Sequence, residues 1–599
     1  MCDHVKLRLT AAPHPSPVTN IKASRYELAR TRQLARAWAA TLPEPMRRDL
    51  AALFTQRAME SYRNHAYPTA RFSDPFSKPY GRLDLAVQQL AEALGREAVP
   101  LPPAEALFQL TSLYTTLLDS RERSALGAFY TPPALAERLL DLAGEHGVDW
   151  RTASILDPAS GGGAFLVPAA RRMRMALASV DPVFALAQIG TRLKGFELDP
   201  YAAWFGQAAV EIELADLAAR ARRPVPIVVH VADTIEEAPT EDYGLVVGNP
   251  PYGRLTLTPD QRARFARSLY GHANLYGVFT DIAVRWAKPN GVIAYLTPTS
   301  FLGGQYFSAL RSMLALEAPP VAVDFVQARS GVFEDVLQET LLAVYRRGQN
   351  ASRFQVHYLQ LTDDAETRLV RNGTVALPAT ASDPWLAPRE PHQAKLIATA
   401  ERMACRLADW GYQVSTGPLV WNRFKSQLKD RPSKQTRPLI WAEAVTTDGR
   451  FIHRAERRGH APYFKIERGD AWLVVDQACV LVHRTTAKEQ PRRLIAAELP
   501  QAFINAEGGV VVENHLNMVR PIASPKVSPA VVAAFLNSAA ADQLFRCING
   551  SVAVSAFELE ALPLPTAAEM TAVERLVARG ADRDHIEAAI VALYKQARV

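Results

Sequence analysis

Cysteine is scarce in this chain of 599 residues, which contains only four. They stand at Cys2, Cys405, Cys479 and Cys547, too far apart for a disulfide framework or a Cys-x-x-Cys metal site. No cluster of His, Cys and carboxylate residues has the spacing of metal ligands. We therefore expect reduced, mostly buried thiols and a protein whose chemistry needs no metal.

Long apolar runs are also missing. No uninterrupted apolar stretch approaches the roughly 18–20 residues that span a bilayer, and the mean hydropathy is −0.07. The first 17 residues carry charges, His and Pro where a signal peptide has an apolar stretch. Apolar residues make up 48% of the chain and charged residues 22%, the usual balance of a globular protein with a large core. These absences predict a cytoplasmic protein that does not engage a membrane.

The excess of basic over acidic residues is confined to one segment. The net charge is +7, and residues 421–495 alone hold sixteen Lys and Arg against eight Asp and Glu, a surplus of +8. The other 524 positions therefore sum to −1. Such a segment is either a solvated surface or a face for a polyanion, and aromatic residues lie between its charges. The candidates for contacts with a polyanion are Arg423, Lys425, Arg431, Lys434, Arg437, Arg454, Arg457 and Arg458.

The pattern of elements changes along the chain. Residues 1–120 indicate an α-helical region, because Ala, Leu, Arg and Glu recur with helical periodicity between proline breaks. From Ser154 onward, short β-branched runs alternate with helical stretches, which predicts a doubly wound, Rossmann-like α/β sheet. The expected strands are Ser154–Leu156, Leu193–Phe196, Ile227–Val231, Leu245–Val247, Val292–Leu296, Ala322–Val326 and Leu341–Tyr345.

The periodicity that marks helices and strands is weaker in the C-terminal part of the chain. Residues 347–390 are polar and contain Gly348, Gly373 and several prolines, which predicts an irregular linker. Beyond about residue 411, short turn-rich β segments are expected up to Pro565. Two helices, near 566–579 and 583–597, are predicted to close the sequence.

A glycine-rich turn follows the first predicted strand of the sheet, in the run Asp157-Pro158-Ala159-Ser160-Gly161-Gly162-Gly163. Glycines let the backbone approach a ligand closely, and a helix expected to begin at Ala164 presents its N-terminus to a negative group. A tight strand–helix turn without a ligand explains the same residues equally well.

Carboxylates end the next two predicted strands. Glu197 follows the second strand, where nucleotide-binding sheets accept hydrogen bonds from ribose hydroxyls. Asp233 follows the third strand, where a carboxylate can face an adenine amino group. The 40 residues from Asp157 to Glu197 exceed the roughly 20 of the dinucleotide fingerprint and argue against a simple dinucleotide dehydrogenase. A solvated strand end for Glu197 and a helix cap for Asp233 are the simpler alternatives.

The most specific motif is Asn249-Pro250-Pro251-Tyr252, which follows the apolar strand Leu245–Val247. Prolines fix the backbone around the Pro250 carbonyl. The Asn249 side-chain oxygen and that carbonyl could then both accept hydrogen bonds from one exocyclic amino group, while Tyr252 offers its face to a planar base. A proline-rich turn with a packed Tyr is the alternative.

Three motifs in this order resemble the γ-class (TaqI-like) DNA adenine-N6 methyltransferases of restriction–modification systems: Gly127–Pro133, Asp157–Leu166 and Asn249–Tyr252. The resemblance extends to about residue 345. It implies a class I methyltransferase fold that uses S-adenosyl-L-methionine as its cofactor. The cofactor-binding residues that it implies are Tyr130, Thr131, Asp157, Ala159, Gly161, Gly163, Glu197 and Asp233.

The resemblance also implies that the target adenine is flipped out of the DNA and stacked between two aromatic rings. Tyr252 is one of these rings. Phe333, within Gly331–Val336, stands where the family presents the second ring, and core packing is the alternative for this residue. The expected catalytic residues are therefore Asn249, Pro250, Tyr252 and Phe333.

The resemblance and the charge pattern together predict a site-specific DNA adenine methyltransferase, the modification component of a restriction–modification system. Double-stranded DNA is the expected partner, and a cognate restriction endonuclease could be encoded separately. The expected division is a helical N-terminal region (1–120), a catalytic domain (121–350), a linker with a connecting helix (351–410), a mixed α/β target-recognition domain (411–565) and C-terminal helices (566–599).

Three other functions share parts of this pattern. The Asn-Pro-Pro-Tyr chemistry also methylates glutamine in translation release factors, but those enzymes resemble compact chains without a large basic C-terminal domain. A methylase fused to a nuclease needs a nuclease region, and a Glu-x-Lys triplet, typical of the commonest nuclease sites, occurs nowhere in the sequence. A non-enzymatic specificity subunit has no need for the glycine-rich turn together with Asn249 and Tyr252.

Overall fold

The structure is a computed structural model of the chain. It describes residues 17–126, 131–238, 243–327, 339–361, 367–486, 490–522, 524–550 and 553–595. Tyr130 and Phe333, two of the predicted site residues, lie outside the described residues. The chain divides into two compact units, one formed by Met1–Gly253 with Ile282–Tyr295 and the other by Arg254–Asp281 with Leu296–Val599.

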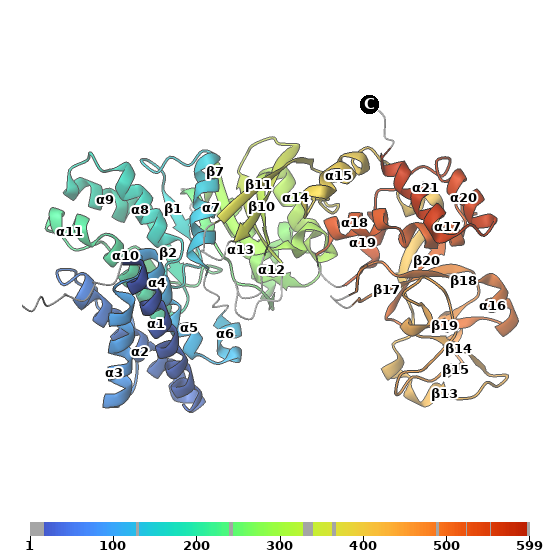
Figure 1. Ribbon diagram of the computed structural model, residues 1–599, viewed down its shortest axis with the longest axis horizontal. Coiled ribbons are helices and arrows are strands. Elements are labelled where there is room, and N and C mark those ends of the chain that lie inside the picture. Colours follow the sequence, from blue (N-terminus) through green and yellow to red (C-terminus); the bar gives the residue numbers. More distant parts are fainter. Residues whose placement is uncertain are drawn as a thin grey trace, which may run out of the picture. The chain divides into compact units, whose positions relative to one another are not determined.

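Helices make up the beginning of the first unit, as the sequence predicted. Pro43 ends the chain's first helical stretch and caps the next, since its fixed φ suits the start of a helix. Helices α1 to α3 lie side by side (Figure 1). Gly95 permits this contact, because a Cβ there would lie 2.3 Å from the Ala58 carbonyl oxygen. The helices are α1 (Pro17–Ala40), α2 (Glu44–Ala66), α3 (Leu85–Ala98), α4 (Pro103–Thr111), α5 (Leu113–Leu117) and α6 (Ser120–Leu126).

A parallel sheet with intervening helices follows in the same unit. Its strands run in the order β3-β2-β1-β4-β7 and pair in parallel, with Leu156 of β1 opposite both Lys194 and Val246. The predicted α/β sheet is thus confirmed in this unit. The strands are β1 (Ile155–Asp157), β2 (Leu193–Glu197), β3 (Val229–Val231), β4 (Tyr243–Gly248) and β7 (Ala287–Pro298). The helices are α7 (Pro133–Glu145), α8 (Leu166–Ala176), α9 (Pro182–Arg192), α10 (Pro200–Glu213) and α11 (Ala215–Ala221), and only the end of α13 (Leu275–Trp286), from Ile282 onward, belongs to this unit.

In the second unit, two strands occupy part of the segment that the sequence indicated as a linker. β8 (Pro320–Gln327) pairs with β9 (Thr340–Arg346) in antiparallel fashion and with β10 (Arg353–Leu361) in parallel, and β11 (Thr367–Ala376) pairs with β10. The prediction of an irregular segment over 347–390 is therefore wrong for 353–361 and 367–376, whereas residues 377–390, all of them described, contain no helix or strand. Phe354, Val356 and Tyr358 alternate along β10 and are buried, while Gly373 takes a positive φ of 96° inside β11 instead of ending it.

Two smaller sheets and seven helices occupy the described part of the chain after residue 390. The sheets have the orders β12-β20-β17-β18 and β13-β15-β14-β19-β16. Their strands are β12 (Tyr412–Thr416), β13 (Leu428–Lys429), β14 (Thr436–Ile440), β15 (Tyr463–Lys465), β16 (Val474–Val475), β17 (Cys479–His483), β18 (Ala496–Leu499), β19 (Val510–Val512) and β20 (Leu516–Pro521). The helices are α15 (Ala394–Ala400), α16 (Gln501–Glu507), α17 (Pro529–Leu536), α18 (Ala539–Ile548), α19 (Ala556–Glu560), α20 (Thr571–Ala578) and α21 (Arg583–Lys595).

The two helices predicted at the C-terminus are present as α20 and α21, but the expected β structure before Pro565 gives way to α17, α18 and α19. Ser538 and Ser555 cap α18 and α19 through their hydroxyls, a signal that the sequence carries. The closing helices also share one core with the strands, since Phe535 packs edge-on against Trp410 at 5.4 Å and lies 6.4 Å from Tyr594. Residues 411–565 and 566–595 are thus not separate in their packing.

In the part of the chain that the structure describes, no single helix is long and apolar enough to cross a bilayer. Only α17 and α18 taken together, across a bend of 66°, reach that length and composition. Cys479 and Cys547 are buried free thiols and Cys405 is partly exposed.

Candidate active site

The candidate site lies at the carboxyl ends of the parallel strands. Asp157 is the last residue of β1, Glu197 is the last of β2, and Asn249 directly follows β4. Because these strands are parallel, their ends meet at one edge of the sheet. The strand order reverses between β1 and β4, which is where ligands bind in open α/β sheets. The fold thus gathers the predicted site residues at a switch point.

The glycine-rich turn between β1 and α8 depends on its glycines. Gly161 and Gly163 have φ values of +50° and +83°. A Cβ on Gly163 would lie 3.2 Å from Gly206 of α10, and a Cβ on Gly206 would lie 2.8 Å from the Gly161 carbonyl oxygen. The turn therefore packs directly on α10, with Gly206 as a partner that the sequence analysis missed. Helix α8 begins at Leu166, two residues after its predicted start.

Glu197 ties this turn to the second strand. Its Oε2 accepts a hydrogen bond from the Gly161 N–H at 2.9 Å, and its Oε1 accepts one from the Asp199 N–H at 2.9 Å. Burial raises the pKa of Glu197 although these N–H donors oppose the shift. A carboxylate has about four lone-pair sites, so two acceptor positions remain for hydroxyl groups of a ligand.

Asp157 is a fully buried carboxyl group beside the turn. Its Oδ1 accepts a hydrogen bond from the Ala159 N–H at 3.1 Å, and its Oδ2 has no partner among the described residues. Burial raises the pKa of Asp157 to about 8, and the negative charge of Glu197 acts in the same direction. A buried acceptor without a donor is costly, so Asp157 suits a bound group that donates to it.

We expect Asp157→Asn to change how stability depends on pH. The pKa is raised in the folded state, so Asp157 binds a proton more readily when folded, and its contribution to the free energy of unfolding falls as pH rises from about 4 to about 8. Asparagine does not titrate. We therefore expect the difference in melting temperature between the ligand-free variant and the wild type to favour the variant more at pH 8–9 than at pH 5, by several degrees. Melting curves at both pH values test this, and parallel pH profiles would contradict it.

Asn249 is held from both sides of its amide. Its Nδ2 donates to the Thr131 hydroxyl at 3.2 Å, and its Oδ1 accepts a hydrogen bond from the Tyr252 hydroxyl at 2.7 Å. Thr131 is 2% exposed, and burial raises the pKa of Tyr252, so that its hydroxyl stays a donor. The orientation of the amide is thereby fixed. Thr131, predicted only as a cofactor contact, also positions Asn249.

Asp233 is exposed and begins a turn after β3. Its Oδ1 accepts a hydrogen bond from the Ile235 N–H at 3.0 Å, the local cap that was its simpler interpretation. The neighbouring Thr234 donates to the Pro158 carbonyl at 2.6 Å and so joins this turn to the glycine-rich turn. Thr234 is a second residue that sequence reasoning missed.

The basic segment of the second unit contains two kinds of side chain. Arg437 and Arg454 are partly buried and donate to the backbone carbonyls of Gly508 at 2.8 Å and Glu443 at 2.5 Å. Their contribution is at least partly structural. The other six candidates are exposed: Arg423, Lys425, Arg431, Lys434, Arg457 and Arg458.

The loop that carries Arg457 and Arg458 is anchored by Glu443. This carboxylate accepts hydrogen bonds from the Glu456 N–H at 2.9 Å and pairs with His460 Nδ1 at 3.0 Å. Burial opposes its ionisation, but the hydrogen bonds from His460 and from backbone N–H groups outweigh burial and lower the pKa of Glu443. Glu443, an isolated acid in a basic segment, gave no signal in the sequence.

Over the described ranges, no group of three or more His, Cys, Asp or Glu side chains is placed to hold a metal ion.

The parallel α/β sheet, the glycine-rich turn at its edge and the fixed Asn-Pro-Pro-Tyr segment together form a Rossmann-like site at the carboxyl ends of the strands. Comparison with known proteins agrees: residues 227–333 match the family model of the Eco57I restriction-modification methylase. The chain is similar to Type II methyltransferase M.PstI of Providencia stuartii, 24% identical over 467 residues, covering 75% of this chain and 89% of that protein. The resemblance to restriction–modification methyltransferases is therefore confirmed.

Two further relatives match shorter parts of the chain. Type II methyltransferase M.BsuBI of Bacillus subtilis is 24% identical over 327 residues, which cover 53% of this chain and 64% of the relative, less than two thirds of its length. M.TthHB8I of Thermus thermophilus is 30% identical over 204 residues, which cover 32% of this chain and 39% of that protein. A solved structure of the Type IIL restriction-modification enzyme MmeI with DNA aligns with a TM-score of 0.49 at 12% identity, covering 98% of this chain and 94% of MmeI.

Proposed function

We propose that the chain is a site-specific DNA methyltransferase that transfers a methyl group from S-adenosylmethionine to N6 of a flipped adenine. The observation that carries the proposal is the fixed Asn249 side chain at the end of β4, on the same sheet edge as Asp157 and Glu197. As the modification component of a restriction–modification system, it would protect DNA from a separately encoded cognate endonuclease.

The residues at the sheet edge fit a nucleoside cofactor. Glu197 has acceptor positions left for two ribose hydroxyls, and the orphaned Oδ2 of buried Asp157 can accept from a donor group of the ligand. Gly161 and Gly163 keep the turn free of side chains beside it. When bound, S-adenosylmethionine supplies an activated methyl group on a sulfonium.

The proposed work of Asn249 is to prepare the adenine nitrogen. The lone pair of an exocyclic amino group is delocalised into the ring. Acceptance of its two hydrogens by Asn249 Oδ1 and the Pro250 carbonyl directs that lone pair toward the methyl carbon. S-adenosylmethionine, when bound, would supply the methyl group to this nitrogen, and the amino group would give up one proton to solvent. The Thr131 hydroxyl accepts a hydrogen bond from Asn249 Nδ2, so the amide oxygen of Asn249 points away from Thr131.

The base must leave the DNA stack before it can reach Asn249. Flipping costs a few kcal/mol, and stacking on an aromatic ring returns roughly 1–3 kcal/mol per base. Tyr252, whose hydroxyl is bound to Asn249, is the proposed platform. Phe333 remains the proposed second ring.

The exposed cations of residues 421–495 are proposed to contact DNA phosphates, which makes affinity depend on salt. We expect joint replacement of Arg431, Lys434 and Arg458 by Gln to flatten the slope of log affinity against log salt by up to about three units. A matched triple, Lys526, Arg575 and Arg579 to Gln, removes the same charge from exposed positions outside the segment and should leave the slope unchanged. Equal slopes for both triples would show that the segment is only a charged surface.

Sequencing of modified bases tests the proposed function in cells. DNA from cells that express the chain should carry N6-methyladenine at one short sequence, and DNA from cells that express Asn249→Ala should not. Unmodified adenine in the wild-type sample, together with methylated glutamine in release factors, would favour the amide-directed alternative.

A further inference from the structure

One exposed cation of residues 421–495 has surroundings that its neighbours lack. Among the described residues, Arg457 is the one exposed candidate that is ion-paired with a carboxylate, since its Nε lies 3.6 Å from Oε2 of Glu443. The Arg457 side chain is 70% exposed, whereas that of Glu443 is 7% exposed. A buried acid thus holds one side of a guanidinium that otherwise faces solvent.

The backbone around Arg457 is fixed as well. Oε1 of Glu443 accepts hydrogen bonds from the Glu456 N–H at 2.9 Å and from the Arg457 N–H at 3.4 Å. The Arg457 carbonyl accepts from the His460 N–H at 3.0 Å and so closes a turn in which Gly459 has a φ of +85°. The fold therefore sets the position of Arg457 before any partner arrives.

His460 attaches this turn to the buried core. Its Nδ1 pairs with Glu443 at 3.0 Å, and its ring stacks on that of Trp441 with 3.8 Å between centroids and 8° between planes. Trp441 is 1% exposed, and its indole N–H donates to the Ala461 carbonyl at 2.7 Å. A group held in this way loses little freedom when it binds, which favours a contact that depends on direction.

The charges around Arg457 favour an uncharged partner over a phosphate. Glu443 balances the charge of Arg457, and the exposed Glu456 adds a second negative charge one residue away. A phosphate contact gains its energy from net positive charge and from the release of counterions, and this turn offers little of either at Arg457. The edge of a base needs donors aimed at its acceptors instead, and guanine presents two acceptors, O6 and N7, in the major groove.

We infer that Arg457 reads a guanine of the recognition sequence from the major groove, with Glu443 as the residue that positions it. The inference rests on the proposed function. Because the ion pair engages Nε, the terminal Nη groups are directed to the O6 and N7 acceptors. Arg458 and Arg431, which have no carboxylate partner among the described residues, keep the proposed role at phosphates. Arg457 is thereby separated from them as a determinant of sequence specificity.

The test asks which sequences are methylated when Arg457 is replaced. Sequencing of modified bases in DNA from cells that express the wild-type chain should define a recognition sequence with at least one G·C pair. We expect Arg457→Ala to accept other base pairs at one such position and to keep every other position. With purified protein and duplex oligonucleotides, the preference for G·C at that position, measured as a ratio of kcat/KM values, should fall about 10- to 150-fold. Glu443→Gln should relax the same position to a smaller extent.

Arg458→Ala is the matched control, because it removes the adjacent exposed guanidinium. It should weaken binding to all sequences alike and flatten the slope of log affinity against log salt by about one unit, whereas Arg457→Ala should change that slope by less than about half a unit. Melting curves check that each variant folds, as the exposure of both side chains leads us to expect.

The outcomes separate this inference from the proposed function. A uniform loss at all sequences for Arg457→Ala, no change in that variant, or a wild-type recognition sequence without a G·C pair would overturn the assignment of Arg457 and leave a DNA adenine methyltransferase. DNA without N6-methyladenine in cells that express the wild-type chain would overturn the proposed function itself, and the inference with it.

Discussion

Asn249→Ala should reduce methyl transfer at least about a hundred- to a thousandfold while S-adenosylmethionine binds nearly as before. The variant removes an acceptor that is aimed at the reacting amino group, and it leaves Asp157 and Glu197 in place. The fixed geometry makes the loss large, because Thr131 and Tyr252 hold the amide in one orientation before the substrate arrives.

Single-turnover incorporation of a labelled methyl group into DNA, combined with calorimetry on the cofactor, separates these two effects. Asn350→Ala, on an exposed residue after β9, is the matched control. Tyr252→Phe keeps the ring and removes only the hydroxyl that donates to Asn249, so it should slow transfer far less than Asn249→Ala. Near-normal turnover by a folded Asn249→Ala protein would contradict the assignment.

The second large effect is expected at Glu197. Its replacement by Ala should weaken S-adenosylmethionine binding by about 10- to 150-fold, which corresponds to hydrogen bonds to a charged group of about 1.5–3 kcal/mol. The structure adds a reason for the upper end of this range. The variant also leaves the N–H groups of Gly161 and Asp199 without their acceptor, so the glycine-rich turn loses its attachment to β2.

Glu197→Gln distinguishes the two contributions. The amide oxygen can still accept from one N–H, but its NH₂ group faces a second donor, so an intermediate loss of affinity is expected. Glu145→Ala on α7 controls for loss of a carboxylate elsewhere in the same unit. An unchanged dissociation constant for Glu197→Ala would contradict the assignment of Glu197 to the cofactor and would leave it only the attachment of the glycine-rich turn to β2.

The sheet could be predicted from the sequence because its signals are local. The central parallel strands β1 and β4 contain short buried apolar runs, as in Leu245–Val247, and each ends in a turn or an acidic residue that the sequence displays. β10 and β11 were missed because their polar composition and Gly373 resemble a loop, whereas tertiary packing buries Phe354 and the whole run Val356–Leu359 of β10. Helices α17 to α19 were missed although Ser538 and Ser555 mark their starts.

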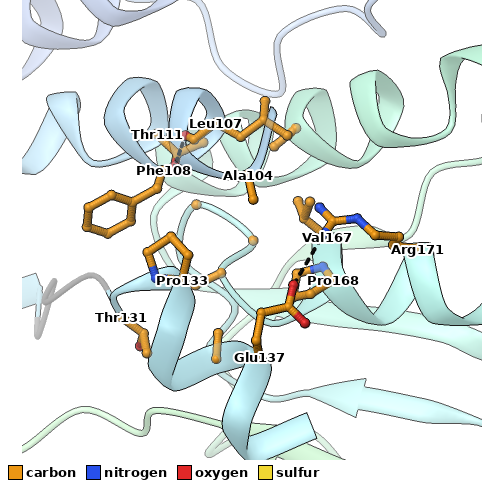
Figure 2. A pocket seen from close by; sticks show the side chains of 15 residues that line it. Ala104, Leu107, Phe108, Thr111, Thr131, Pro133, Glu137, Val167, Pro168 and Arg171 are labelled. Atoms are coloured by element: carbon orange, nitrogen blue, oxygen red, sulfur yellow. Dashed lines mark hydrogen bonds and ion pairs between the residues drawn. The ribbon is translucent and has the colours of Figure 1, made fainter. Parts of the chain in front are cut away.

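The candidate site could be predicted from the sequence only in part, for a different reason. The sequence places Asn249, Glu197 and Asp157 at strand ends, but partners far away in the sequence fix their geometry. Thr131 lies 118 residues from the Asn249 that it orients. The residues of α4 that line a pocket beside the glycine-rich turn (Figure 2), and the anchoring of the basic loop by Glu443, likewise depend on tertiary contacts. No spacing in the sequence predicts them.

The most direct test of the account is the identity of the methylated base. The purified chain is incubated with duplex DNA and S-adenosylmethionine that carries a labelled methyl group, and the DNA is then digested to nucleosides and separated by mass. The account predicts that the label is found in N6-methyl-2′-deoxyadenosine and is lost with Asn249→Ala. Label in a methylated cytidine, or DNA without label while the cofactor binds normally, would contradict it.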